Sequence, residues 1–284
     1  MTVDQAWRPS SIELARQAYR RHQTGRSLLI GAASTVAFAT LAWFLLVNTP
    51  GWARVQESFF DLETWAGAWP RVWHGFLLNL QILVFAVVGV AIVASLLAFL
   101  RTLRGPVWFP LRFLAATYTD IFRGTPLIIV LYLVGFGVPG LVQQRIPTEV
   151  LGTVALVITY SAYVAEVLRA GLESVHPSQR MAARALGYTH GQTLRIVVLP
   201  QGIRKVTPAL MNDFIAMQKD VGLVSILGAV DAVRAAQIET ARFADFSPYV
   251  LAGLLFIALA WPMIRLTDWV TARMQRREQS GGTV

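Results

Sequence analysis

The sequence predicts an all-α integral membrane protein, a helical bundle of six transmembrane helices with a helix–turn–helix on its cytoplasmic side. Hydrophobic residues make up 55% of the 284 residues and charged residues 14%, whereas soluble domains contain roughly 25% charged residues. The mean hydropathy is +0.52. Apolar stretches recur at lengths near the roughly 20 residues that cross a bilayer as a helix. Basic residues concentrate in alternate segments between these stretches, as expected when successive segments lie on opposite sides of a membrane.

The predicted spans cover residues 27–47, 75–100, 126–142, 150–168, 208–230 and 248–266. The first exceeds the apolar core of a signal peptide, usually about 7–15 residues, so we expect a retained anchor. A hydroxyl residue followed by proline suits the first turn of a helix. This device marks three of the predicted starts, at Thr125-Pro126, Thr207-Pro208 and Ser247-Pro248.

The distribution of basic residues predicts the orientation. Of the 25 lysines and arginines, 19 lie in segments 1–26, 101–123, 169–205 and 265–284. The positive-inside rule therefore places both termini in the cytoplasm. The tryptophans of the external segment 48–74 suit a membrane interface. The net charge of +9 is divided among several loops, so nucleic acid is not an expected partner.

Both terminal tails are expected in the cytoplasm, at 1–26 and 276–284. Residues 10–26 are expected to form a basic helix on anionic lipid, the alternative being a disordered tail that only sets the topology.

Several kinds of chemistry are excluded or disfavoured. The chain has no cysteine, which excludes disulfides and thiolate metal sites. It has no Gly-Lys pair, so a Walker A phosphate loop is absent. The four histidines lack metal-binding spacing, and no nucleophile or zinc-protease motif occurs. We expect no catalytic residue, no metal and no cofactor in this chain.

The cytoplasmic segment 169–205 has helical character rather than linker composition. Residues 181–186 favour a helix, and Gly187 suits a left-handed stop. Thr189 and Gln192 have the spacing of a capping box that opens a second helix, which Pro200 is expected to end. The small side chains of Ala182, Ala183 and Ala185 would let another surface approach the backbone. From the pattern alone, this segment either docks a partner or merely caps the bundle.

Four strings in this order resemble the permease subunits of binding-protein-dependent ABC importers, and in particular their polar amino acid branch. They are DIFRGTPLI (120–128), SAYVAEVLRAGLESV (161–175), SQRMAARALGYTHGQTLRIVVLPQ (178–201) and MQKDVGLVSILG (217–228). The third is similar to the EAA loop of that family. The resemblance covers residues 75–275 and implies a five-helix permease core, with 27–47 as an additional N-terminal helix.

The resemblance implies a function in the cell inner membrane. A second permease subunit, either a sister chain or a copy of this one, would complete the path for a polar amino acid. An extracytoplasmic binding protein would deliver the solute, and a dimer of ABC ATPase subunits would bind ATP and Mg²⁺ and dock on the loop. The residues implied in ATPase coupling are Met181, Ala182, Ala183, Ala185, Gly187, Leu199 and Pro200.

The chain departs from the family pattern at three places. Met181 replaces the glutamate of the EAA motif, and Ser178 replaces a glycine. Docking through packing rather than charge is therefore expected, because methionine adapts to apolar grooves. Val221-Gly222 stands where the family has threonine and serine, which leaves the solute open.

Polar side chains within the predicted spans are candidates for a transport path or for a buried polar network that fixes helix packing. These residues are Asn79, Glu166, Asn212, Asp213, Lys219 and Asp220. Glu166 precedes Arg169 by three positions, so a local ion pair is geometrically allowed. Two rival functions, a secondary transporter and an intramembrane enzyme, predict features that differ from those of this sequence. A secondary transporter often carries an internal repeat, and none is evident; an intramembrane enzyme needs a catalytic constellation, and none is present.

Overall fold

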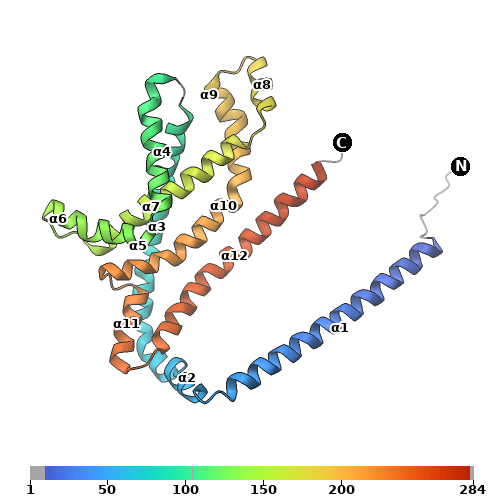
Figure 1. Cartoon of the computed structure of the whole chain (residues 1–284), viewed down its shortest axis with the longest axis vertical. Helices are drawn as coiled ribbons and strands as arrows, with labels where there is room; N and C mark the ends of the chain where they lie inside the picture. The colour runs from blue at the N-terminus through green and yellow to red at the C-terminus, as the bar shows by residue number, and fades with distance from the viewer. Residues whose placement is uncertain (1–9, 104, 282–284) are drawn as a thin grey trace. The chain divides into compact units, whose positions relative to one another are not determined.

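The structure, a computed structural model, describes residues 10–103 and 105–281. Arg104, and the parts of the predicted tails at 1–9 and 282–284, lie outside the described residues. Within those ranges every regular element is helical, which confirms the all-α class. The α-helices in Figure 1 are α1 (Ser11–Val47), α2 (Trp52–Phe59), α3 (Leu62–Thr102), α4 (Phe109–Gly124), α5 (Leu127–Tyr132), α6 (Val138–Val142), α7 (Thr148–Glu173), α8 (Pro177–Ala185), α9 (His190–Gln192), α10 (Leu199–Asp220), α11 (Ala232–Phe243) and α12 (Ser247–Gly281). Short 3-10 or π-helical segments connect some of them, namely η1 (Pro106–Trp108), η2 (Leu133–Gly137), η3 (Thr193–Val198) and η4 (Val221–Leu227).

The chain divides into two compact units, residues 1–57 and residues 58–284. The first unit contains α1, one continuous helix over the described tail and the predicted anchor. Ser10 caps its first turn by accepting a hydrogen bond from the Glu13 amide at 3.3 Å. The helix predicted over the tail is confirmed from Ser11 onward, and the disordered alternative is wrong there. Within α1, Gln23–Val47 is long and apolar enough to cross a membrane.

The second unit contains α3, a helix of 41 residues that includes the predicted span 75–100. Asp61 caps its first turn by accepting hydrogen bonds from the amides of Glu63 and Thr64 at 3.1 and 3.2 Å. Much of the predicted external segment is therefore helical, in α2 and the first turns of α3. In those turns the rings of Trp69 and Trp73 stack with centroids 5.5 Å apart.

The predicted span 126–142 is helical from Leu127 to Val142. Elements α5, η2 and α6 cover it, and the chain bends by 108° between this stretch and the preceding residues Pro106–Gly124. The sequence did not predict α4 as a separate helix, because Arg112 and Arg123 interrupt its apolar run. Thr125 ends α4 rather than capping α5, since its hydroxyl donates to the Ile121 carbonyl at 2.8 Å.

The start predicted at Thr207-Pro208 is wrong, because α10 begins at Leu199 and continues through Pro208. Pro200, expected to end the preceding helix, instead lies in the first turn of α10. Pro200 directly follows the π-helical η3, where the α-helical hydrogen-bond pattern is already interrupted, so the missing N–H is accommodated. Along its length α10 packs against both α7 and α12.

The start predicted at Ser247-Pro248 is confirmed by α12. The Ser247 hydroxyl accepts a hydrogen bond from the Asp61 amide at 3.0 Å, which ties the start of α12 to the start of α3. By length and composition, four helices of the described residues could cross a membrane. The number rises to six if each of the two bent pairs, 106–142 and 190–243, counts as one span.

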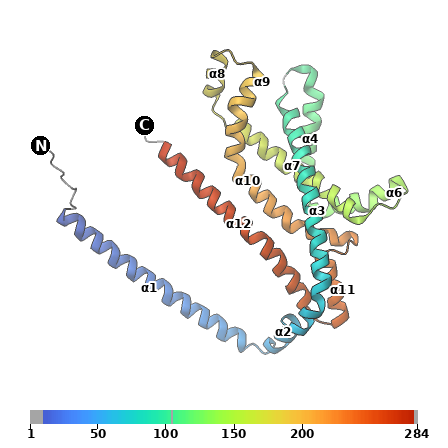
Figure 2. The same ribbon diagram turned by 180° about the vertical axis from the view of Figure 1, so that it is seen from behind.

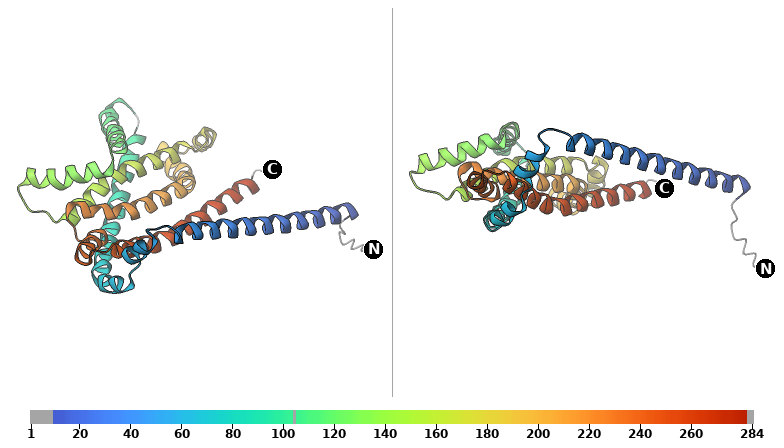
Figure 3. Two further views of the ribbon diagram at one scale, coloured as in Figure 1. Left: turned by 60° about the horizontal axis from the view of Figure 1, so that its bottom comes forward. Right: turned by 90° about the horizontal axis from the view of Figure 1, so that it is seen from below.

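The core of the second unit lies among α3, α7 and α10, with α11 and α12 packed on α3 (Figures 2 and 3). Its buried centre is apolar and includes Ala86, Leu131, Leu156 and Val224. Elsewhere α3 meets the start of α11 without an intervening side chain. A Cβ on Gly75 would lie 2.4 Å from the backbone carbonyl carbon of Asp231.

Gly75→Ala is expected to destabilise the protein, because the new methyl group would overlap backbone atoms that cannot rotate away. Overpacking of this kind costs about 1–3 kcal/mol and should lower the midpoint of thermal unfolding in detergent. Gly253→Ala in α12 is the matched control, since a Cβ there meets nothing within 4 Å. An unchanged midpoint for Gly75→Ala would contradict the close contact of α3 with α11.

Candidate functional site

The cytoplasmic segment folds into two short helices joined by a tight turn, and we call residues 174–201 the elbow. Its first helix, α8, ends at Gly187, whose φ of +87° is left-handed. The Gly187 amide donates to the Arg184 carbonyl at 3.0 Å, and the Tyr188 amide donates to the Ala183 carbonyl at 3.2 Å. These two bonds form a Schellman cap, which confirms the left-handed stop predicted at Gly187.

The second helix of the elbow opens with the predicted capping box. The Thr189 amide donates to Gln192 Oε1 at 2.8 Å, and the Gln192 amide donates to Thr189 Oγ1 at 3.3 Å. The helix widens into η3 and passes into α10 without interruption. Both ends of the turn are therefore fixed by hydrogen bonds, so the elbow is a defined structure rather than a flexible loop.

The two helices of the elbow pack against each other and leave an apolar outer face. Ala183 is the one buried residue of α8, which lies against η3. It is therefore a packing residue and does not share the exposed surface predicted for it. The side chains of Met181 and Leu186 are 64% and 79% exposed. Ala182, Ala185 and Gly187 are exposed beside them, as are Leu199 and Pro200 further along.

A shallow groove runs across the elbow between α8 and η3. Its volume is about 420 Å³, and it is lined by Arg180, Met181, Arg184, His190, Leu194 and Val198, with Thr193 at its floor. Within residues 174–201 there is no aspartate or glutamate. The elbow therefore presents a surface that combines apolar and basic side chains.

The elbow is anchored to the bundle by polar contacts at its base. The guanidinium of Arg180 donates to the Leu172 carbonyl at the end of α7. Lys205 Nζ, on α10, donates to the Ser174 carbonyl at 3.0 Å. Both bonds use carbonyls that the end of α7 leaves without helical partners.

Below these contacts α7 and α10 cross at two glycines. A Cβ on Gly202 would lie 2.9 Å from the carbonyl oxygen of Gly171, so the two backbones touch. A rotation of the elbow would therefore be carried directly into both helices.

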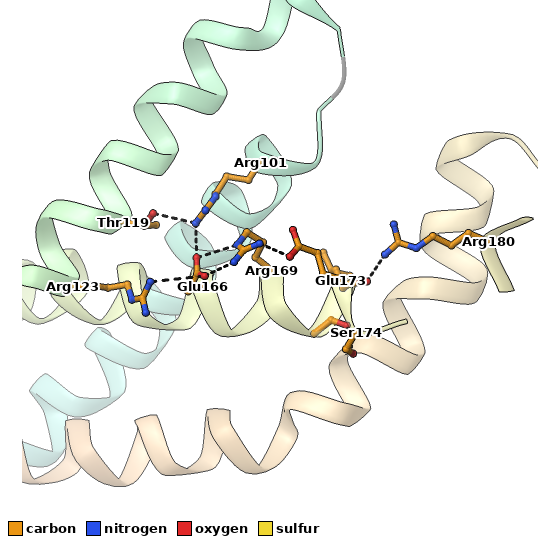
Figure 4. Close-up of polar contacts among 10 residues, drawn as sticks. Arg101, Thr119, Arg123, Glu166, Arg169, Glu173, Ser174 and Arg180 are labelled. Carbon is orange, nitrogen blue, oxygen red and sulfur yellow. Dashed lines mark hydrogen bonds and ion pairs between the residues drawn. The ribbon is translucent and has the colours of Figure 1, made fainter. Parts of the chain in front are cut away.

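One carboxylate joins three helices near the base of the elbow (Figure 4). Glu166 on α7 accepts hydrogen bonds from Arg169, at 3.1 and 2.5 Å, and from Arg101 on α3 at 2.7 Å. Arg123 on α4 approaches the same carboxylate at 3.9 Å. The local pair of Glu166 with Arg169, which the spacing allows, is present. The side chains of Glu166 and Arg101 are only 19% and 17% exposed, so this pair is shielded from water, whereas Arg169 and Arg123 are 29% and 41% exposed.

Sequence reasoning did not identify Arg101 or Arg123 as partners of Glu166. They lie 65 and 43 residues away along the chain, and only the packing of α3 and α4 on α7 brings them together. Arg101 also donates to Thr119 Oγ1 at 3.1 Å, and Arg169 pairs with Glu173. The sequence signal for Arg101 and Arg123 is the excess of arginine near the ends of apolar runs, which by itself predicts topology and does not identify ion-pair partners.

The other predicted polar residues occupy two kinds of position. Asn79 is fully buried, donating to Asp231 Oδ2 at 3.0 Å and accepting from the Ala232 amide at 3.0 Å. Asp220 accepts a hydrogen bond from the Tyr160 hydroxyl at 2.7 Å. These two side chains belong to networks that join helices. Asn79 has no exposed surface to offer a solute, whereas Asp220 is half-buried.

Three further polar residues lie on α10. Asn212 and Lys219 are exposed in this chain, whereas Asp213 is half-buried and one of its oxygens has no hydrogen-bond partner among the described residues. Lys219 forms no ion pair within the part of the chain that the structure describes. On α10, therefore, Asn212 and Lys219 lie on an exposed face and Asp213 lies on a partly buried one.

Comparison with known proteins places this arrangement in a family. The family described as "Binding-protein-dependent transport system inner membrane component" matches residues 108–276. The arginine transport system permease protein ArtQ of Bacillus subtilis is 34% identical over 194 residues, which are 67% of this chain and 86% of that protein. The probable glutamine ABC transporter permease protein GlnM of Bacillus subtilis is 30% identical over 203 residues, 71% and 92% of the two chains.

Solved structures agree with the relatives. The crystal structure of an amino acid ABC transporter with histidines is 32% identical and has a TM-score of 0.69, covering 75% of this chain and 98% of that one. An inward-facing MetNI methionine ABC transporter has 22% identity and a TM-score of 0.55, which supports the fold alone.

Glu166→Gln is expected to destabilise the protein, because Arg101 would keep its shielded charge without a counter-ion and Arg169 would keep only Glu173. Breaking a shielded pair costs about 3–5 kcal/mol when fully buried, so a loss of about 2–3 kcal/mol is expected here. Glu173→Gln, whose side chain is 61% exposed, is the matched control and should cost less than about 1 kcal/mol. Thermal unfolding midpoints in detergent measure the difference, and equal midpoints would refute the joining role of Glu166.

Proposed function

Because the chain belongs to the family of binding-protein-dependent transport system inner membrane components, and is therefore an ABC importer permease, we propose that it moves a polar amino acid, driven by an ATPase docked on the elbow. It is a multi-pass membrane protein and a transport subunit rather than an enzyme. The observation that carries the proposal is the construction of the elbow, whose turn is locked and whose base is tied to α7 and α10.

The elbow has the properties of a lever. A flexible loop would absorb a displacement imposed by a partner, whereas close-packed elements move together. Here the Schellman cap and the capping box hold α8 against the second helix. The crossing of Gly171 with Gly202 then couples that helix to α7. We propose that closure of an ATPase dimer tilts α8, and that this tilt moves α7 and α10.

The docking surface in this proposal consists of Met181, Ala182, Ala185, Gly187 and Leu186. Leu186 was not among the predicted coupling residues, but its exposure places it beside Met181. Contact with this face is expected to rest on apolar packing, because methionine fills irregular grooves and alanine lets a partner approach closely. Ala183, Leu199 and Pro200 support the face from within the elbow and at its root.

The remaining subunits follow from the proposal. ATP and Mg²⁺ would be bound by the partner ATPase, since this chain lacks a Gly-Lys phosphate loop. A second permease subunit would complete the path, and an extracytoplasmic binding protein would deliver the solute. We propose that the elbow and both termini lie in the cytoplasm, because 19 of the 25 basic residues lie in segments 1–26, 101–123, 169–205 and 265–284.

A polar amino acid is the proposed solute because the relatives are named for arginine and glutamine transport. The exposed face of α10 is the proposed path, since ionisable groups in a membrane face protein or water rather than lipid. Lys219 there can bind the α-carboxylate of an amino acid, and Asn212 offers a further polar contact. Asn79, Glu166 and Asp220 hold the helices that frame this face.

Gly187→Val is expected to uncouple transport, because a β-branched residue is strained at a φ of +87° and the turn would open. Gly187→Asn should keep most of the activity, since asparagine tolerates the left-handed region. Uptake and solute-stimulated ATP hydrolysis are measured with the full complex in proteoliposomes. Equal activities for the two variants would contradict the requirement for a locked turn.

Lys219→Gln is expected to lower uptake by roughly tenfold or more while leaving assembly with the ATPase unchanged, because a charged hydrogen bond to the solute carboxylate contributes about 1.5–3 kcal/mol. Arg265→Gln is the control, since Arg265 is exposed and paired only with Asp268 at 3.5 Å. Normal uptake by Lys219→Gln would exclude Lys219 from the solute path.

A further inference from the structure

A groove of about 450 Å³ lies between α10 and α12, at the ends of these helices nearest the base of the elbow. Three cations line it, Arg204 and Lys205 from α10 and Arg273 from α12, and no acidic residue lines it among the residues that the structure describes. The groove is separate from the proposed docking face on α8, and none of its lining residues belongs to the proposed solute path.

The three cations lack counter-ions within the described residues. Lys205 Nζ donates to a neutral acceptor, the Ser174 carbonyl at 3.0 Å. The Arg273 guanidinium lies over the ring of Trp269, 5.1 Å from its centroid. Arg204 forms no ion pair in the part of the chain that the structure describes. Three positive charges therefore converge on one groove from two helices without being neutralised.

The position of the groove along the helices matches the level of lipid head groups. Arg204 and Lys205 come just before the apolar stretch 208–230, and Trp269 and Arg273 come just after the apolar stretch 248–266. Trp269 is 55% exposed, and tryptophan rings favour the interface between hydrocarbon and water. Val270 and Met274 add an apolar wall on the α12 side.

We propose that this groove binds the head group of an anionic phospholipid, with its phosphate among Arg204, Lys205 and Arg273 and its glycerol region against Trp269. Basic pockets between membrane helices recognise anionic head groups through the same chemistry. An acidic protein surface would satisfy the three cations equally well. The exposed tryptophan and its apolar neighbours at the end of a span favour lipid, because they suit a ligand that is charged at one end and apolar at the other.

The proposal goes beyond transport itself, because it does not depend on which solute or ATPase this chain serves. It does bear on the elbow. Lys205 contacts both the groove and the Ser174 carbonyl at the start of the elbow, so a bound head group would link α12 to the root of that structure.

The test uses the purified full chain and native mass spectrometry with phosphatidylglycerol or phosphatidylcholine as the probe. The wild type should retain phosphatidylglycerol in preference. The variant Arg204→Gln/Lys205→Gln/Arg273→Gln should bind it roughly 10- to 100-fold more weakly, since each cation near an anionic lipid contributes roughly a fivefold factor. The control variant, Arg184→Gln/Arg195→Gln/Arg265→Gln, removes the same charge outside the groove and should bind within roughly threefold of the wild type.

A second measurement does not depend on the folding of the triple variant. Brominated phosphatidylglycerol should quench tryptophan fluorescence of the wild type, and the quenched part of the signal should be missing in the Trp269→Phe variant. Equal phosphatidylglycerol binding by the wild type and the groove variant would overturn the proposal. So would displacement of the lipid by millimolar inorganic phosphate, which would indicate a site for free anions. Loss of ATPase capture by the groove variant with unchanged lipid binding would assign the groove to a protein partner instead.

Discussion

The contact on which the second unit depends is the crossing of α7 and α10 at Gly171 and Gly202. A Cβ on Gly202 would lie 2.9 Å from the Gly171 carbonyl oxygen, so backbone meets backbone with no flexible side chain between them. Close-packed interiors transmit displacement because they have little free volume to absorb it. The elbow follows the end of α7 and leads into α10, so this crossing holds the two ends of the elbow together as one rigid unit. Glu166 lies about one and a half turns earlier on α7. Its ion pairs with Arg101 and Arg123 connect this rigid unit to α3 and α4.

The bilayer imposes a second constraint, because backbone groups without hydrogen bonds are costly where water is absent. The α-helical part of α10 ends at Asp220, inside an apolar stretch, and gives way to η4. The terminal carbonyls there need donors, and Asn79 Nδ2 donates to the Val221 carbonyl at 3.3 Å. Asn79 Oδ1 also accepts a hydrogen bond from the Ala232 amide at the start of α11. One buried asparagine on α3 thus serves a helix end and a helix start, which allows the chain to bend between η4 and α11.

Local signals in the sequence predicted local structure well. The left-handed stop at Gly187 and the capping box at Thr189 depend on neighbouring residues, and both are present. The start of α12 at Ser247 was likewise predictable. Proline was ambiguous, because a proline can begin a helix, end it or lie within it, and here α10 contains both Pro200 and Pro208.

In the candidate site, too, contacts between neighbours in the sequence were predictable, whereas contacts made by tertiary packing were not. The pair of Glu166 with Arg169 could be derived from their spacing, whereas Arg101 and Arg123 could not. The inward position of Ala183 also escaped prediction, because it depends on how α8 rotates against η3 and not on the composition of α8. The bend before α5 depends on tertiary packing in a similar way, since a run of apolar residues does not specify its own direction.

The replacement of a glutamate by Met181 changes what the elbow can offer a partner. Residues 174–201 hold Arg180, Arg184 and Arg195 and no acidic side chain. Arg180 is engaged with the Leu172 carbonyl, so the remaining basic groups and the exposed Met181 and Leu186 define the surface. An ATPase whose cleft presents a buried cation for a glutamate would leave that cation unpaired here, which is costly. If the proposed docking on the elbow is correct, a matching ATPase would supply apolar and acidic side chains, and the ATPases of related importers would fit this surface less well.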